Sequence, residues 1–163
     1  MRIIVIGSGY VGETFSILME GLGNEIFRIT KSGSGHSIAM DVSNFKSVQS
    51  IKDSIGDVDA VIHCASSGSR GKDRIQQYQK VYVEGCKNLV ESFSDSMVLF
   101  VSSSSVYGQN DESIVDEKSK TEPPAKTVPS NPTTGESETQ GAELFTYRDS
   151  LTQTFFPVFP LMA

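Results

Sequence analysis

The sequence has little cysteine, fewer basic than acidic residues, and no long apolar run. Its 163 residues include only two cysteines, Cys64 and Cys86, whose spacing fits neither a metal site nor a disulfide framework. The net charge is −6, so neither a nucleic-acid backbone nor an anionic membrane surface is an expected partner. No apolar stretch approaches the roughly 20 residues that cross a bilayer. We therefore expect a cytoplasmic protein with two reduced, buried cysteines and no metal site.

The first hundred residues alternate short β-branched runs with helical patterns, which is typical of a parallel sheet with crossover helices. The predicted fold is α/β, a Rossmann-type doubly wound parallel sheet in three αβα layers. The apolar run 3–6 leads directly into a glycine loop and is expected to be a buried strand, not a signal peptide. Gly85, inside a long predicted helix, indicates close packing against a neighbour. The predicted strands are 2–6, 25–30, 37–41, 60–64 and 97–102, and the predicted helices are 10–20, 48–55 and 73–94.

Residues 7–12 read Gly-Ser-Gly-Tyr-Val-Gly between the first predicted strand and helix. In that context the G-x-G-x-x-G pattern predicts a dinucleotide site, because the helix N-terminus offers N–H groups to a pyrophosphate. The first glycine permits the tight turn, the second admits the pyrophosphate, and the third lets the helix pack on the strand. The alternative is a glycine-rich turn without a ligand. The candidate binding residues are Gly7, Gly9, Tyr10, Val11 and Gly12.

The end of the second predicted strand bears on the choice of cofactor. A carboxylate there would bind the ribose 2′-hydroxyl of NAD, but this strand ends without one. Lys31, together with Arg28, could instead pair with the 2′-phosphate of NADP. The alternative is that both are ordinary surface cations. The sequence thus favours NADP over NAD and leaves both open.

The chain changes character after Tyr107. Residues 108–138 are rich in Ser, Thr, Pro and charged residues, which predicts a long loop. We assign residues 1–145 to an NAD(P)-binding Rossmann domain and 146–163 to a tail, the start of a missing substrate lobe.

Several segments together resemble the extended and atypical short-chain dehydrogenase/reductases, the NAD(P)-dependent epimerase/dehydratase group. The likeness covers roughly residues 1–120, and the G-x-G-x-x-G loop is similar to that of the atypical branch. It implies that Asp41 and Val42 contact the adenine ring and that Cys64, Ala65 and Ser66 lie along the cofactor. It also implies that Ser103 is the catalytic serine. The alternative is that a run of serines at a strand end is turn chemistry, but the strand position and the Val-Tyr-Gly that follows favour the catalytic role. The resembling segments are 4–12, 41–42, 59–66, 82–89, 100–108 and 115–117.

The chain departs from the family in one catalytic feature. The family's Tyr-x-x-x-Lys pair, whose tyrosine transfers a proton, is missing: residues 132–143 contain neither residue type, and Tyr147 is followed at the lysine position by Leu151. Atypical members share this loss. His63 is a poor replacement, because a histidine in such a strand is expected to be packed and hydrogen-bonded. The family also continues into a substrate lobe beyond the position of Ala163, so this chain looks like a fragment.

Three functions follow from these features. The first is an epimerase/dehydratase-like oxidoreductase acting on a small molecule such as a nucleotide-sugar, with a homodimer as a candidate assembly. The second is a non-catalytic NAD(P)-binding sensor or regulatory module, which the missing Tyr-x-x-x-Lys favours. The third is an inactive truncated fragment.

Overall fold

A computed structural model describes residues 1–68, 74–102, 107, 114, 116 and 119. Residues Met1–Val101 belong to one compact unit, to which the elements below belong. A second unit begins at Ser102, and in it the hydroxyl of Ser119 donates to the Asp116 carboxylate at 3.0 Å. The predicted boundary at residue 145, the long loop 108–138 and the missing tyrosine–lysine region fall largely or wholly outside the described residues.

Five parallel strands form one sheet in the order β3-β2-β1-β4-β5. Their bounds are β1 Arg2–Ile6, β2 Glu25–Thr30, β3 Ile38–Ala39, β4 Ala60–His63 and β5 Met97–Phe100. The first two match the predicted strands, and the last two end one or two residues early. Prediction of a strand over 37–41 was wrong in extent, because only Ile38 and Ala39 pair with β2. The predicted parallel Rossmann-type sheet is confirmed.

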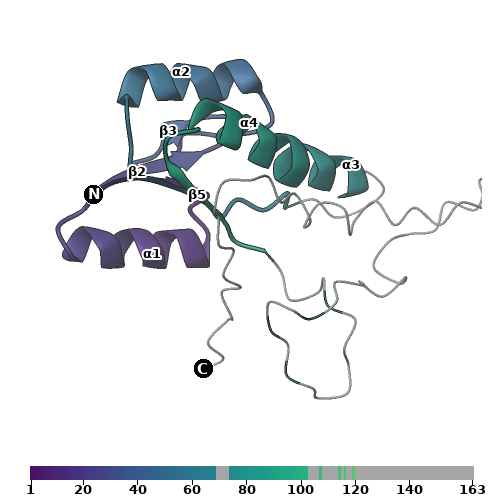
Figure 1. The fold of residues 1–163 in the computed structure, drawn as a ribbon, viewed down its shortest axis with the longest axis horizontal. Coiled ribbons are helices and arrows are strands. Elements are labelled where there is room, and N and C mark those ends of the chain that lie inside the picture. The colour runs from purple at the N-terminus through teal and green to yellow at the C-terminus, as the bar shows by residue number, and fades with distance from the viewer. Residues whose placement is uncertain (69–73, 103–106, 108–113, 115, 117–118, 120–163) are drawn as a thin grey trace, which may run out of the picture. The chain divides into compact units, whose positions relative to one another are not determined.

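Helices cover the sheet on both faces (Figure 1). Helix α1, Tyr10–Gly21, packs Phe15 and Met19 on one face, against Ile3, Val5, Ala60 and Ile62. Helices α2, Phe45–Ile55, and α4, Gly85–Ser92, pack on the other face, against residues such as Ile4, Val61 and Val98. Alternate residues of β1 therefore point into two separate cores, which is why this strand is apolar throughout.

Helix α2 begins three residues earlier than predicted. The side chain of Asn44 accepts a hydrogen bond from the backbone N–H of Ser47 at 3.2 Å and caps the first turn. Asparagine is one of the preferred N-cap residues. The signal was present in the sequence, but the apolar periodicity that begins at Val48 concealed it.

The long helix predicted over 73–94 is three helical segments. Helix α3 spans Arg74–Tyr78, a π-helix η1 spans Gln79–Glu84, and α4 follows it. Within η1 the carbonyl of Val81 lies 3.0 Å from Nε2 of the buried His63. Directly after η1, a Cβ at Gly85 would lie 3.1 Å from the methyl groups of Val42. The predicted close approach at Gly85 is thus confirmed, and short π-helical turns are often found near functional sites.

A compact loop, not a helix, joins β2 to β3. Its hydroxyl groups bond to one another: Thr30 Oγ1 lies 2.7 Å from Ser37 Oγ and accepts from the N–H of Gly33. The Ser37 hydroxyl also donates to the carbonyl of Ser34. In the described part of the chain, α1 is consequently the one helix on its face of the sheet.

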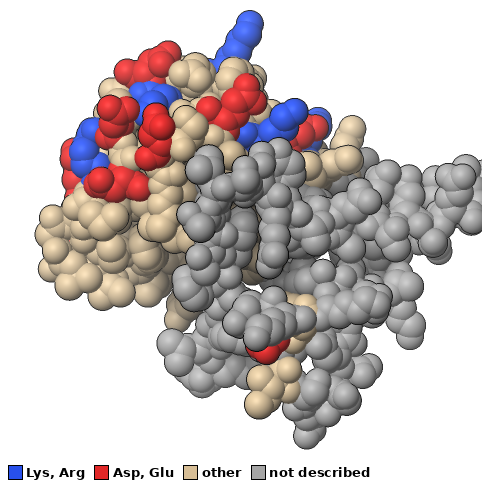
Figure 2. Space-filling view, viewed as in Figure 1, with Lys and Arg blue, Asp and Glu red and all other residues tan. Residues whose placement is uncertain are grey.

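The outer face of α1 carries no charge. Tyr10, Ile17, Leu18 and Leu22 are exposed there, and Figure 2 shows an uncharged surface where α1 lies, with the charged residues gathered elsewhere. Glu13 and Glu20, the two acidic residues of α1, both pair with Arg28 of β2. No helix among the described residues is long and apolar enough to span a bilayer.

Candidate dinucleotide site

The strand order changes direction between β1 and β4. From β1 the chain passes outward to β2 and β3, and it then returns to place β4 on the other side of β1. The two strands end together, since the N–H of Cys64 donates to the carbonyl of Ile6 at 2.8 Å. Ligands of open parallel sheets bind at such a switch point, outside the carboxyl ends of the strands. The predicted glycine loop and the predicted segment 64–66 both begin here.

The glycines of the loop have different surroundings. Gly7 has φ +100°, and a Cβ on it would lie 2.7 Å from the backbone nitrogen of Ala65. At Gly12 a Cβ would lie 2.0 Å from the carbonyl oxygen of Gly7. At Gly9, by contrast, a Cβ would meet no atom within 4 Å. Two glycines therefore fix the turn against its neighbours, while the middle one faces open space.

The N-terminus of α1 lacks a capping side chain. Its N-cap residue is Gly9, and the first helical residues, Tyr10 and Val11, are exposed. Helix α2 differs, because Asn44 caps its first turn. The first N–H groups of α1 have no capping side chain and carry the positive end of the helix dipole, so they suit an anion.

The segment after β4 lies beside this loop. Cys64 is half-buried beside the α1 core, and burial raises the pKa of its thiol to about 11. Ala65 is partly buried and Ser66 is exposed. The thiol is therefore protonated near neutral pH, and Cys64 contributes shape to the site but no nucleophile.

His63 is a fully buried member of β4. Its Nε2–H donates to the carbonyl of Val81, and its Nδ1 accepts the N–H of Ala65 at 3.3 Å, so the ring is held in one neutral tautomer. Burial lowers its pKa, although the hydrogen bond to Val81 opposes that shift. The expectation of a packed, hydrogen-bonded histidine is confirmed. What the sequence did not show is that His63 ties the π-helix η1 to the segment that faces Gly7.

The ends of β2 and β3 bring two opposite charges together. Nζ of Lys31, just after β2, lies 2.9 Å from Oδ2 of Asp41, just beyond β3. Partial burial opposes ionisation of Asp41, but hydrogen bonds from Lys31 and Ser43 outweigh it and hold its pKa below the ordinary value. The side chain of Val42 is buried against Gly85, and its carbonyl accepts from Asn88 at 2.9 Å.

Arg28, the other candidate cation, is already paired. Its guanidinium bonds to the carboxylates of Glu20 and Glu13 on α1. It therefore compensates the charges of both acidic residues of α1, chiefly that of Glu20 near the end of the helix. Of the two cations that the sequence offered for a 2′-phosphate, Lys31 is the exposed one.

Ser103 is the one predicted site residue that falls outside the described residues. Its role as catalytic serine therefore stays a prediction. Within the described residues, no cluster of three or more His, Cys, Asp or Glu side chains could hold a metal ion.

A five-stranded parallel sheet with a glycine turn at its switch point defines a Rossmann-type protein. A model of the NAD dependent epimerase/dehydratase family matches residues 3–132, and the chain belongs to that family. No curated protein sequence matches the chain.

Solved structures show the same fold. A short-chain dehydrogenase/reductase superfamily protein from Agrobacterium tumefaciens, with bound NAD, is 25% identical with a TM-score of 0.61 and matches 76% of this chain and 39% of its own. L-threonine dehydrogenase from Clostridium difficile is 18% identical with a TM-score of 0.63, over 76% of this chain and 43% of its own. ADP-L-glycero-D-manno-heptose-6-epimerase from Helicobacter pylori is 20% identical with a TM-score of 0.59, over 72% and 43%. The chain thus spans less than half the length of these three proteins.

Proposed function

We propose that this unit binds a nicotinamide dinucleotide, with its pyrophosphate at the N-terminus of α1. The observation that carries the proposal is the contrast within the glycine loop. Gly7 and Gly12 are pressed against neighbouring backbone, whereas Gly9, at the uncapped start of the helix, faces open space. A diphosphate fits such a position, because it needs N–H donors, positive potential and no side chain in its path.

The other predicted residues lie at the carboxyl ends of neighbouring parallel strands, at the same edge of the sheet. Cys64, Ala65 and Ser66 extend from β4 beside Gly7, and we propose that the nicotinamide half of the cofactor runs along them. Lys31, Asp41 and Val42 stand at the ends of β2 and β3, where the adenosine half would lie. Lys31 supports NADP(H), since it is exposed and the end of β2 has no carboxylate of its own.

We further propose an epimerase/dehydratase-like oxidoreductase that acts on a nucleotide-sugar or a related small metabolite. Family membership supports this class, and the bound NAD of the Agrobacterium protein supports the cofactor. The second candidate is a non-catalytic NAD(P)-binding sensor, supported by the missing Tyr-x-x-x-Lys pair. Assembly as a homodimer stays a prediction.

Titration calorimetry tests the cofactor proposal. The 163-residue chain is titrated separately with NAD⁺, NADH, NADP⁺ and NADPH, with nicotinamide mononucleotide as the ligand that lacks the adenosine half. At least one dinucleotide should bind more tightly than the mononucleotide. A folded chain that binds none of the four dinucleotides would contradict the proposal.

A further inference from the structure

Strand β2 ends without a carboxylate, but a carboxylate lies close to that end. It belongs to Asp41, which follows β3. Thr30 of β2 pairs with Ala39 of β3, so the residues just beyond these strands meet at the same edge of the sheet. There Oδ2 of Asp41 lies 2.9 Å from Nζ of Lys31. In Rossmann units this edge receives the ribose that carries either a 2′-hydroxyl or a 2′-phosphate. The site therefore holds an acid and a base where one or the other usually selects the cofactor.

The two partners are held differently. Oδ1 of Asp41 accepts the N–H of Ser43 at 3.0 Å and its hydroxyl at 2.7 Å, and the N–H of Asp41 donates to Oγ of Ser47. The side chain of Asp41 is 36% exposed, whereas that of Lys31 is 77% exposed. The carboxylate is thus a fixed charge, whereas the ammonium group is carried on an exposed side chain.

Opposite charges at one position act oppositely on the two cofactors. A 2′-phosphate carries close to two negative charges near neutral pH, so Lys31 attracts it and Asp41 repels it. A 2′-hydroxyl is neutral and can donate to a carboxylate. Asp41 also holds the ammonium of Lys31, which must leave or share this partner to meet a phosphate.

We propose that Asp41 is a specificity-determining residue that opposes Lys31 and restrains the preference for NADP(H) over NAD(H). This proposal rests on the proposed function, because it presumes that a nicotinamide dinucleotide binds at this edge. It adds this role to the adenine contact that the resemblance implies for Asp41, and it goes beyond the interpretation in which Lys31 alone decides between the cofactors. The choice between cofactors then depends on the balance of one fixed carboxylate and one exposed ammonium group.

A double-mutant cycle tests the balance. NAD⁺ and NADP⁺ are titrated into the wild type, Asp41→Asn, Lys31→Gln and the double variant, at low and at high salt. Asn keeps one oxygen that can accept from Ser43, removes the charge, and replaces the oxygen that faces Lys31 with an NH2 group. Asp41→Asn should raise the NADP⁺ to NAD⁺ affinity ratio about tenfold, and Lys31→Gln should lower it about tenfold. The Asn effect should be smaller in the Gln background, because Asp41 then has no ammonium group to hold away from the phosphate. It should also be smaller at high salt, because salt screens the repulsion between Asp41 and the phosphate.

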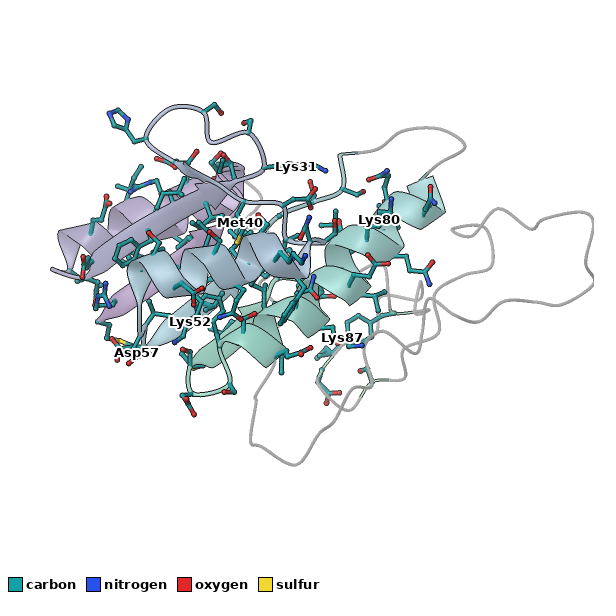
Figure 3. All side chains as sticks on the ribbon, turned by 90° about the horizontal axis from the view of Figure 1, so that it is seen from above. Lys31, Met40, Lys52, Asp57, Lys80 and Lys87 are labelled. Atoms are coloured by element: carbon teal, nitrogen blue, oxygen red, sulfur yellow. The ribbon has the colours of Figure 1, made fainter. Side chains whose placement is uncertain are left out.

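A second ion pair provides the matched control. Nζ of Lys52 lies 2.8 Å from Oδ1 of Asp57, near the amino end of the sheet, and Figure 3 shows this pair apart from Lys31. Lys52→Gln and Asp57→Asn should leave the affinity ratio unchanged. Because the readout is a ratio measured on one protein, partial unfolding would lower both affinities alike.

The outcomes are distinct. If Asp41→Asn leaves the affinity ratio unchanged and both cofactors still bind, the specificity role of Asp41 is wrong. The proposed function would then still stand. An equal effect of Asp41→Asn in the presence and absence of Lys31 would overturn the idea that Asp41 acts by holding the ammonium group of Lys31. Failure of the wild type to bind any dinucleotide would refute the proposed function, and the role of Asp41 would fall with it.

Discussion

Gly12 lies directly over the carbonyl of Gly7. A Cβ at position 12 would lie 2.0 Å from that oxygen, closer than two non-bonded atoms can approach. Gly12 is on the first turn of α1, and Gly7 is the residue that follows β1. The contact therefore fixes the helix against the strand end that it follows.

We predict that Gly12→Ala lowers the free energy of unfolding by about 1–3 kcal/mol, because the helix must move away from the strand. Gly21→Ala in the same helix is the control. A Cβ there meets no atom within 4 Å, so alanine should leave stability unchanged or raise it slightly. Urea unfolding of both variants measures the difference. Equal effects at the two positions would show that the contact at Gly12 is unimportant.

Substitution of Gly9 should affect cofactor binding and not stability. Its φ of −74° suits any residue, its Cβ position is open, and aspartate is a good N-cap, so Gly9→Asp should fold with unchanged or higher stability. The carboxylate would nevertheless occupy the N–H groups of α1 and repel a pyrophosphate. We expect cofactor affinity to fall about a hundredfold or more.

Two variants separate the causes of that loss. Gly9→Asn caps the helix without a charge and should lose less affinity than Gly9→Asp. Gly21→Asp places the same charge at the far end of α1 and should not affect binding. Normal calorimetric titration of folded Gly9→Asp would place the pyrophosphate elsewhere.

The sequence could predict most of the sheet because its strands are defined by local apolar runs. Strand β1 lies between two cores and β4 is buried throughout, so both are unbroken apolar segments whose ends are visible in the sequence. Strand β3 was overestimated because Ser37 enters the hydroxyl network of the preceding loop and Met40 lies beyond the last pair. Propensity does not report such tertiary hydrogen bonds.

The sequence could predict the part of the candidate site that depends on one short motif. It could not predict the part that depends on pairing between strands. Gly7, Gly9 and Gly12 lie within six residues and show their roles through spacing. Lys31 and Asp41 come together only because β2 and β3 pair in one register, which the sequence does not give. The sequence also did not show the π-helix η1, nor the hydrogen bond between Val81 and His63, which joins separate elements.

The buried His63 makes stability depend on pH. Burial lowers its pKa in the folded protein below the ordinary 6.5, so below about pH 6.5 the unfolded chain binds a proton that the folded chain does not. The stability from neutral His63 is present above that pH and is lost as the pH falls. We expect the melting temperature of the wild type to decrease from pH 7.5 to pH 5.5.

His63→Phe checks the origin of that change. The variant should be less stable at pH 7.5, because the hydrogen bonds to Val81 and Ala65 are lost, but its melting temperature should fall less on acidification. His36→Gln, which alters an exposed histidine, should keep the wild-type pH dependence. Parallel pH profiles for the wild type and His63→Phe would assign the acid sensitivity to other groups.

The last prediction concerns turnover. Carbonyl reduction needs a group that holds the carbonyl oxygen and a proton donor whose pKa is near the working pH. The resemblance offers Ser103 for the first role. For the second, the described groups with shifted pKa values at this edge are unsuitable: His63 is buried and held neutral, the pKa of Asp41 is lowered, and that of Cys64 is raised to about 11. We therefore predict that these 163 residues bind NAD(P) but reduce ketone or nucleotide-sugar substrates negligibly.

Oxidation of NADPH and NADH, followed by absorbance against a substrate panel, measures that activity. Ser103→Ala is the catalytic control, and Gly9→Asp is the control for activity that does not use the dinucleotide site. Turnover that both substitutions abolish would show that the missing Tyr-x-x-x-Lys is not disabling and that another residue supplies the proton. Tyr82, whose hydroxyl accepts the N–H of Ser67 at 3.4 Å in the segment after β4, would be the first to replace by phenylalanine. Cofactor binding without turnover would instead agree with both the sensor hypothesis and the truncated-enzyme hypothesis, because in each the dinucleotide site is intact and the proton donor is missing.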